Sequence, residues 1–137
     1  MSLEDTLAGV PLFSQLSGRD LTRLAKASVT RAFRNGEVMV KEGEQAVAFY
    51  VISKGKAEVL KGGQTLATLG AGDFFGEMAL LDGYLRSASV RAMEDSECLV
   101  LSRWDFLAEL RGNPHIAVAM LPVLSRRLRE ADQRTAM

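Results

Sequence analysis

Apolar and polar residues alternate with a period of two between residues 29 and 101, in short runs separated by glycine-containing turns. This pattern predicts half-buried β-strands, because successive side chains of a strand point to opposite faces of the sheet. Asn35-Gly36 favours a tight turn, so we expect a hairpin between strands at residues 30–33 and 38–40. Short strands at regular intervals favour a mainly β fold, a β-roll of the jelly-roll or double-stranded β-helix type.

The segment before residue 29 has the period of a helix. Ser17 followed by Asp20 is typical of a helix N-terminus, because the serine hydroxyl can accept a hydrogen bond from an amide of the first turn. The apolar positions that follow form a stripe on one helix face: Leu21, Leu24 and Ala25. We therefore expect an N-terminal helical region over residues 1–28.

The segment after residue 101 is helical as well, and Ser102 with Asp105 repeats the N-terminal signature. We expect Trp104 to anchor this helix on the roll, and Asn113-Pro114 to begin a second helix. The second helix carries apolar residues at every fourth position: Ile116, Met120, Leu124 and Leu128. Pro122 interrupts it and predicts a bend, since proline lacks a backbone donor and its ring crowds the preceding turn.

The chain of 137 residues suits a single domain with a real core. We expect that domain to hold helices over residues 1–28, the β-roll over 29–101 and helices over 102–137. The 17 basic and 17 acidic residues cancel, so the net charge favours neither nucleic acid nor a membrane as partner of this chain alone.

The chain offers little for disulfide or metal chemistry. One cysteine, Cys98, excludes an internal disulfide, and its apolar strand context is typical of a buried, unreactive thiol. The single histidine, His115, excludes a histidine-based metal cluster and argues against a cupin-type metalloenzyme, which shares the β-roll architecture. No apolar run reaches the ~18 residues of a membrane span and the start is no signal peptide, so we expect a cytoplasmic protein.

Residues 73–92 do not have the pattern of ordinary core. Gly76-Glu77 opens a short apolar helical turn that breaks at Asp82-Gly83, and Arg86 is followed by small residues. Glycine lets the backbone approach a ligand, and the first amides of a helix are available donors for a phosphate oxygen. Arg86 adds a fork of donors and Ser87 a hydroxyl, whereas the Glu77 carboxylate suits sugar hydroxyls rather than phosphate. The segment therefore predicts a site for a small anion with a hydroxylated neighbour.

Residues 75–90 resemble the phosphate-binding cassette of cyclic nucleotide-binding domains, found in protein-kinase regulatory subunits, gated ion channels and catabolite-activator-type bacterial transcription factors. The resemblance extends from about residue 10 to 132. It implies that Glu77 binds the ribose 2′-hydroxyl and that Arg86 pairs with the cyclic phosphate. The other phosphate donors that it implies are Gly76, Met78, Ala79, Ser87 and Ala88. Leu85 stands where many members have proline, which predicts a looser loop.

The same resemblance implies a wall for the base and a helical lid. Val59 and Leu66 would line the base pocket, although both also fit as strand core. In the family the last helix moves over the base, and in the transcription factors it also forms the dimer seam. Leu128, Ala131 and Asp132 would then contact the base, and Arg127 would couple to the cassette. A solvated basic stretch is the alternative for this end of the chain.

We interpret the chain as a sensor and not an enzyme, with cAMP or cGMP as ligand and neither a cofactor nor a metal. In the family a hydroxyl residue at the position of Ser87 can contact the guanine amino group of syn cGMP. The same residue contacts phosphate in cAMP-binding bacterial members, and we favour cAMP. The signal would pass through the C-terminal helix to a homodimer partner, an effector protein or an effector domain. Two alternatives stay open: Glu77 and Arg86 pair with each other in an interaction module that binds no nucleotide, or the chain is the ligand-binding fragment of a larger regulator.

Overall fold

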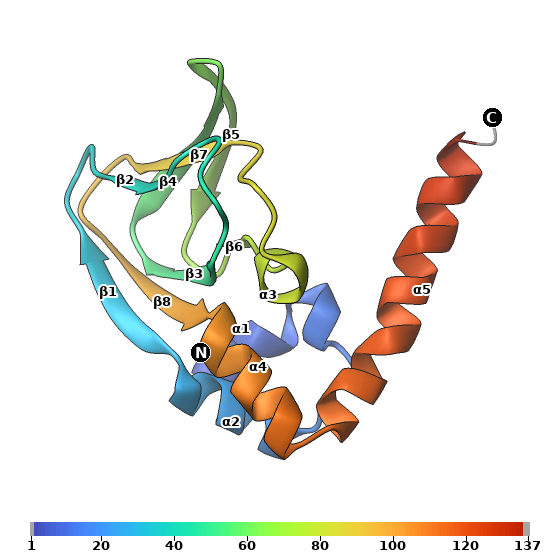
Figure 1. The fold of residues 1–137 in the computed structure, drawn as a ribbon. Helices are drawn as coiled ribbons and strands as arrows, with labels where there is room; N and C mark the ends of the chain where they lie inside the picture. Colours follow the sequence, from blue (N-terminus) through green and yellow to red (C-terminus); the bar gives the residue numbers. More distant parts are fainter. Residues whose placement is uncertain (1, 136–137) are drawn as a thin grey trace. The chain divides into compact units, whose positions relative to one another are not determined.

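A computed structural model describes residues 2–135 of the chain (Figure 1). It divides into two compact units. One spans Ala27–Phe106 and contains all the strands of the described chain. The other joins the two ends of the chain, up to Lys26 and from Leu107 onward, and is helical.

The strands of the first unit form two four-stranded antiparallel sheets, which confirms the predicted jelly-roll class (Figure 1). One sheet has the order β1 (Val29–Phe33), β8 (Ser96–Ser102), β3 (Ala48–Lys54), β6 (Phe74–Phe75). The other has the order β2 (Val38–Val40), β7 (Ser89–Ala92), β4 (Lys56–Lys61), β5 (Gln64–Gly70). A short helix, α3 (Ala79–Asp82), lies between β6 and β7 in the chain.

The core of the roll is built by inward side chains of both sheets, among them Tyr50 and Ile52 from one sheet and Ala57 and Val90 from the other. Cys98 belongs to this cluster and is fully buried, as the alternating pattern predicts. Burial raises the pKa of the Cys98 thiol to about 11, and the nearby charge of Arg31 only partly opposes this. The thiol is therefore protonated at neutral pH and unreactive.

The predicted hairpin at Asn35-Gly36 is wrong. The turn itself forms, because the Glu37 amide donates to the Arg34 carbonyl (2.9 Å) and Gly36 takes a φ of 86°. However, β1 pairs with β8 and β2 pairs with β7, so the turn carries the chain from one sheet to the other. The same turn sequence suits a hairpin within one sheet and a crossover between two sheets, and only the long-range strand pairing distinguishes the two.

The second unit contains α1 (Leu3–Ala8), the short 3-10 helix η1 (Pro11–Phe13), most of α2 (Gly18–Ala27), and α5 (His115–Thr135). The linking helix α4 (Arg103–Gly112) begins in the first unit. The two predicted N-caps are confirmed: the Asp20 amide donates to Ser17 Oγ (3.2 Å), and the Asp105 amide donates to Ser102 Oγ (3.1 Å). Within the described residues, no helix has the length and apolar character needed to cross a membrane.

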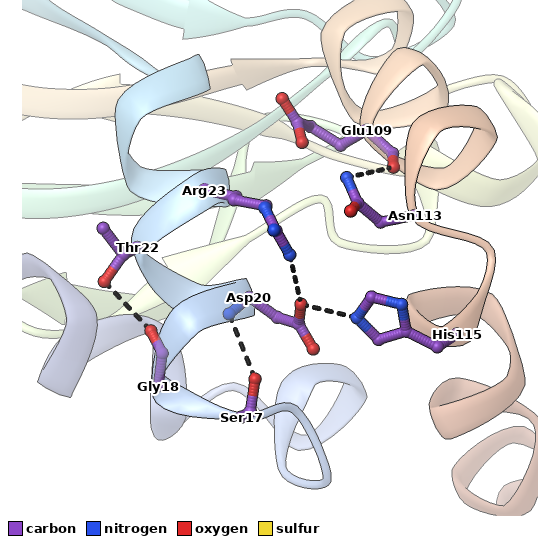
Figure 2. Close-up of polar contacts among 8 residues, drawn as sticks. All are labelled: Ser17, Gly18, Asp20, Thr22, Arg23, Glu109, Asn113 and His115. Atoms are coloured by element: carbon purple, nitrogen blue, oxygen red, sulfur yellow. Dashed lines mark hydrogen bonds and ion pairs between the residues drawn. The ribbon is translucent and has the colours of Figure 1, made fainter.

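Asp20 is a buried carboxylate at the start of α2 that pairs with the first residue of α5 (Figure 2). Its Oδ1 accepts from Arg23 Nη1 at 3.1 Å and lies 2.8 Å from His115 Nε2. Burial alone would raise the pKa of Asp20, but hydrogen bonds with His115 and Ser17 and the charges beside it hold that pKa below its ordinary value. This cluster fixes the N-terminal end of α5 to α2.

Three details of the predicted helices differ in the structure. Trp104 is 70% exposed and does not anchor α4; the buried aromatic of this helix is Phe106. The Asn113 side chain donates to the Glu109 carbonyl at the end of α4 instead of capping α5. Helix α5 runs through Pro122, and the bend expected there stays a prediction. Along α5 the buried residues are Ile116, Met120 and Val123, whereas Leu128 is exposed.

Candidate ligand-binding site

A cavity of about 400 Å³ opens beside the cassette, within the unit that holds the roll. Its apolar wall comes from both the roll and the cassette: Val40, Val59, Phe75 and Val90. Most of the predicted site residues line it: Gly76, Met78, Ala79, Arg86, Ser87, Ala88 and Val59. The cavity therefore combines an apolar wall, a guanidinium and a hydroxyl, which suits a ligand with an anionic and an apolar part.

Within the cassette, a tight turn precedes α3 and a left-handed residue ends it. Gly76 has a φ of 82°, and its carbonyl accepts from the Ala79 amide at 3.0 Å. Gly83 ends α3 with a φ of 63°, and its amide donates to the Ala79 carbonyl at 3.2 Å. The turn before α3 already uses the Ala79 amide, and donation from this amide to a phosphate oxygen stays a prediction.

Arg86 is held against the roll by its own hydrogen bond. Its Nη2 donates to the carbonyl oxygen of Ala48 at 2.6 Å, and its Cζ lies 5.9 Å from the centroid of the Tyr50 ring. Burial lowers the pKa of the Arg86 guanidinium, and Tyr50 acts in the opposite direction. An arginine remains a cation at neutral pH, so the cavity presents one half-buried positive charge here.

Gly76 provides the space in which the Arg86 side chain lies. A Cβ built on Gly76 would overlap Arg86 Nη1, and it would lie 3.3 Å from Arg86 Cζ and 3.1 Å from the Ala48 carbonyl oxygen. We predicted from the sequence that this glycine lets the backbone approach a ligand. The structure adds a different reason for it, because any side chain at this position would displace the arginine.

The backbone around Arg86 is paired with the loop that follows β2. The Arg86 amide donates to the Glu44 carbonyl (2.8 Å), and the Arg86 carbonyl accepts from the Gly43 amide (2.9 Å). Leu85 forms an antiparallel bridge with Gln45. This pairing sets the position from which Arg86 reaches the cavity, and the looser loop expected from Leu85 stays a prediction.

Four predicted site residues lie elsewhere. Glu77 is half-buried and lies outside the lining that the described residues give to the cavity. Leu66 is 59% exposed at an irregularity in the pairing of β5 with β4, so its contact with a base stays a prediction. Arg127 and Ala131 belong to α5, in the other unit, and their roles also stay predictions, as do those of the neighbouring Leu128 and Asp132.

The sequence did not predict the residues that hold Arg86 in place. The Ala48 carbonyl and the Tyr50 ring both belong to β3, where they lie within an apolar run typical of core. Tyr50 also stacks on Phe75, with ring centroids 4.9 Å apart and planes 6° from parallel. A backbone carbonyl has no sequence signature, and an aromatic in a buried strand indicates only packing, so no local pattern identified them.

The sequence and the fold were then compared with those of known proteins. Residues 30–113 match the family model of the cyclic nucleotide-binding domain. The chain is 40% identical over 131 residues to the cyclic AMP receptor protein of Thermus thermophilus, covering 92% of this chain and 61% of that protein. It is 36% identical over 107 residues to a cGMP-dependent protein kinase of Toxoplasma gondii, covering 78% of this chain and 11% of the kinase. The chain thus spans less than two thirds of these relatives.

A solved structure agrees with these sequence matches. The N-terminal domain of a transcriptional regulator from Streptomyces coelicolor superposes with a TM-score of 0.87 at 27% identity, covering 94% of this chain and 96% of that one. The family match extends over the whole roll and the cassette, where the cavity has an arginine beside an apolar wall. The chain belongs to the cyclic nucleotide-binding domain family.

Proposed function

We propose that this chain is a sensor that binds cAMP in preference to cGMP in the cassette cavity. The observation that carries the proposal is the Arg86 guanidinium, which lines the same cavity as the apolar wall formed in part by Val59. A cyclic phosphate at Arg86 would gain a charge-assisted pair. The volume of about 400 Å³ lies within the range of small-ligand sites, and Val40 and Val90 would face the apolar base or sugar edge.

The preference for cAMP rests on Ser87. Its hydroxyl lines the cavity directly after Arg86, where it can donate to a phosphate oxygen. A cAMP ligand uses the hydroxyl in this way, whereas cGMP in the syn form would draw it toward the guanine amino group. Glu77 would accept from the ribose 2′-hydroxyl once a ligand is bound.

The output of the sensor would pass through α5. Val118, Leu121 and Leu128 of this helix are 63%, 61% and 64% exposed, and the spacing between the two leucines is one heptad. Exposed apolar residues at this spacing support a seam with a second copy of the helix. A nucleotide can act on this output only by its differential affinity for two arrangements of the chain. The effector, whether an attached domain or a separate protein, would respond to that difference.

Calorimetric titration with cAMP and with cGMP tests the proposal. We expect saturable binding of cAMP with a higher affinity than cGMP, and a loss of roughly ten- to hundredfold in Arg86→Ala, since a hydrogen bond to a charged group contributes about 1.5–3 kcal/mol. Arg91→Ala is the matched control, because Arg91 lies on β7 outside the cavity and pairs with Glu58. If neither nucleotide at millimolar concentration raises the melting temperature of the folded protein, the chain is not a cyclic-nucleotide sensor.

A further inference from the structure

Arg103 is the first residue of α4, directly after strand β8 of the roll. Its backbone amide donates to the Val47 carbonyl at 2.8 Å, just before β3. Its side chain leaves α4 and reaches the cassette. Arg103 therefore joins the first turn of α4 to two places in the roll unit, the start of β3 and the cassette.

The Arg103 side chain meets the carbonyl end of α3. Its Nη2 lies 3.4 Å from the carbonyl oxygen of Leu81, to which it donates. Its Cδ and Nε pass 3.5 Å from the position that a Cβ on Gly83 would take. Helix carbonyl ends carry a partial negative charge and lack partners within the helix, so a cation at this end stabilises it.

The guanidinium of Arg103 is not fully satisfied. Its Nε is buried, and among the described residues it has no hydrogen-bond partner. A buried donor without a partner costs free energy, so the other contacts of this side chain, among them the Leu81 carbonyl, must offset that cost. The first turn of α4 does not itself require a guanidinium beside the carbonyl end of α3.

We propose that Arg103 is a positioning residue of the cassette, which holds the carbonyl end of α3 and couples the occupancy of the cavity to the first turn of α4. The coupling part rests on the proposed function. The amino-terminal side of α3 carries the Gly76 turn over which Arg86 lies, and Arg86 follows Gly83 by three residues. A ligand phosphate that binds Arg86 or the Gly76 turn would also shift α3, and the Arg103–Leu81 hydrogen bond is a contact between α3 and α4.

The chain has a built-in reporter for this coupling. Trp104 is the only tryptophan, it follows Arg103 directly, and it is 70% exposed. Its emission therefore reports on the first turn of α4. The Gly83 amide, which donates to the Ala79 carbonyl, reports on the end of α3 through hydrogen exchange and needs no nucleotide.

The test compares Arg103→Met, which keeps an unbranched stem without charge, with Arg103→Lys, which keeps charge without the guanidinium. Arg111→Met is the matched control, because Arg111 is exposed near the end of the same helix. We expect Arg103→Met to speed exchange at Gly83 and to weaken cAMP binding by about tenfold. We also expect it to abolish the change in Trp104 emission at saturating cAMP, with Arg103→Lys intermediate and Arg111→Met unchanged.

Each outcome decides one part. Unchanged Gly83 exchange in Arg103→Met overturns the positioning role, and a wild-type Trp104 response in that variant at saturating cAMP overturns the coupling. If Arg103→Met does not fold, Arg103→Lys is judged by the same two measurements. If the wild-type chain binds neither nucleotide, the proposed function and the coupling both fail, whereas Gly83 exchange in the free variants still decides the positioning role.

Discussion

Replacing Gly76 with alanine tests whether this glycine exists to make room for Arg86. The φ of 82° at Gly76 is in the left-handed region, where an alanine costs roughly 1–2 kcal/mol. Gly72, on the other side of the short strand β6, has a φ of 92° and nothing within 4 Å of an added Cβ. Gly72→Ala therefore carries the same backbone cost without displacing any side chain.

The two variants should differ in affinity much more than in stability. In Gly76→Ala the new methyl overlaps Arg86 Nη1, and the nearby Ala48 carbonyl leaves it no other space. The arginine is long and can swing away, but it then loses its hydrogen bond to the Ala48 carbonyl. Unfolding should therefore become easier by about 1–2 kcal/mol in Gly72→Ala and by about 1 kcal/mol more in Gly76→Ala. When Arg86 leaves the cavity, the cyclic phosphate of the ligand loses a charge-assisted hydrogen bond, which contributes about 1.5–3 kcal/mol. The affinity for cAMP should therefore fall roughly ten- to hundredfold in Gly76→Ala and not in Gly72→Ala.

Urea denaturation gives the stabilities and isothermal calorimetry the affinities, each on wild type and both variants. The reasoning is refuted if Gly76→Ala binds cAMP as tightly as Gly72→Ala, because Arg86 would then not depend on the space above Gly76. A crystal structure of Gly76→Ala with the guanidinium still on the Ala48 carbonyl would contradict it as well.

Three further predictions concern the fold. Phe106→Ala should destabilise the protein by about 3–5 kcal/mol in denaturant, because Phe106 is fully buried, whereas Trp104→Ala should change stability by less than about 0.5 kcal/mol; equal effects would contradict the assignment of the anchor. Asp20→Asn should cost about 1–3 kcal/mol at neutral pH. Since the folded pKa of Asp20 is lowered, its contribution is present above the ordinary value of 3.8 and is lost as the pH falls through the folded pKa, so the difference from wild type should shrink in acid, and a constant difference would argue against the pairing. Because Cys98 is buried and its pKa is raised to about 11, it should react with a thiol reagent at pH 8 only when the protein unfolds locally, so the labelling rate should rise with denaturant concentration. Rapid labelling of the native protein would contradict its burial.

The features predictable from the sequence are those whose chemistry is local. The spacing from Gly76 to Arg86 predicted the cavity lining, since a glycine turn, a helical turn and an arginine are specified within a few residues of one another. The helix caps at Ser17 and Ser102 were predictable for the same reason. A cap is a contact between residues three positions apart, so the sequence alone contains both partners.

The features that escaped prediction depend on partners far along the chain. Asn35-Gly36 was assigned to a hairpin because the turn sequence does not show which sheet the next strand joins. Arg86 depends on a backbone carbonyl 38 positions away, which any residue type would supply. Trp104 was taken for the anchor of α4 because hydrophobicity predicts burial, but a two-position offset puts Phe106 inside and leaves Trp104 in solvent.

Strand β3 serves two tasks at once. From Ala48 to Ile52 every residue is buried, and the same stretch supplies the carbonyl and the ring that hold Arg86. If the cavity binds the proposed nucleotide, the atoms that pack the sheet also position the guanidinium that binds the ligand. A design that changes ligand affinity should therefore alter residues at the rim of the cavity and keep β3 unchanged, because a substitution in β3 changes the stability of the sheet together with the position of Arg86.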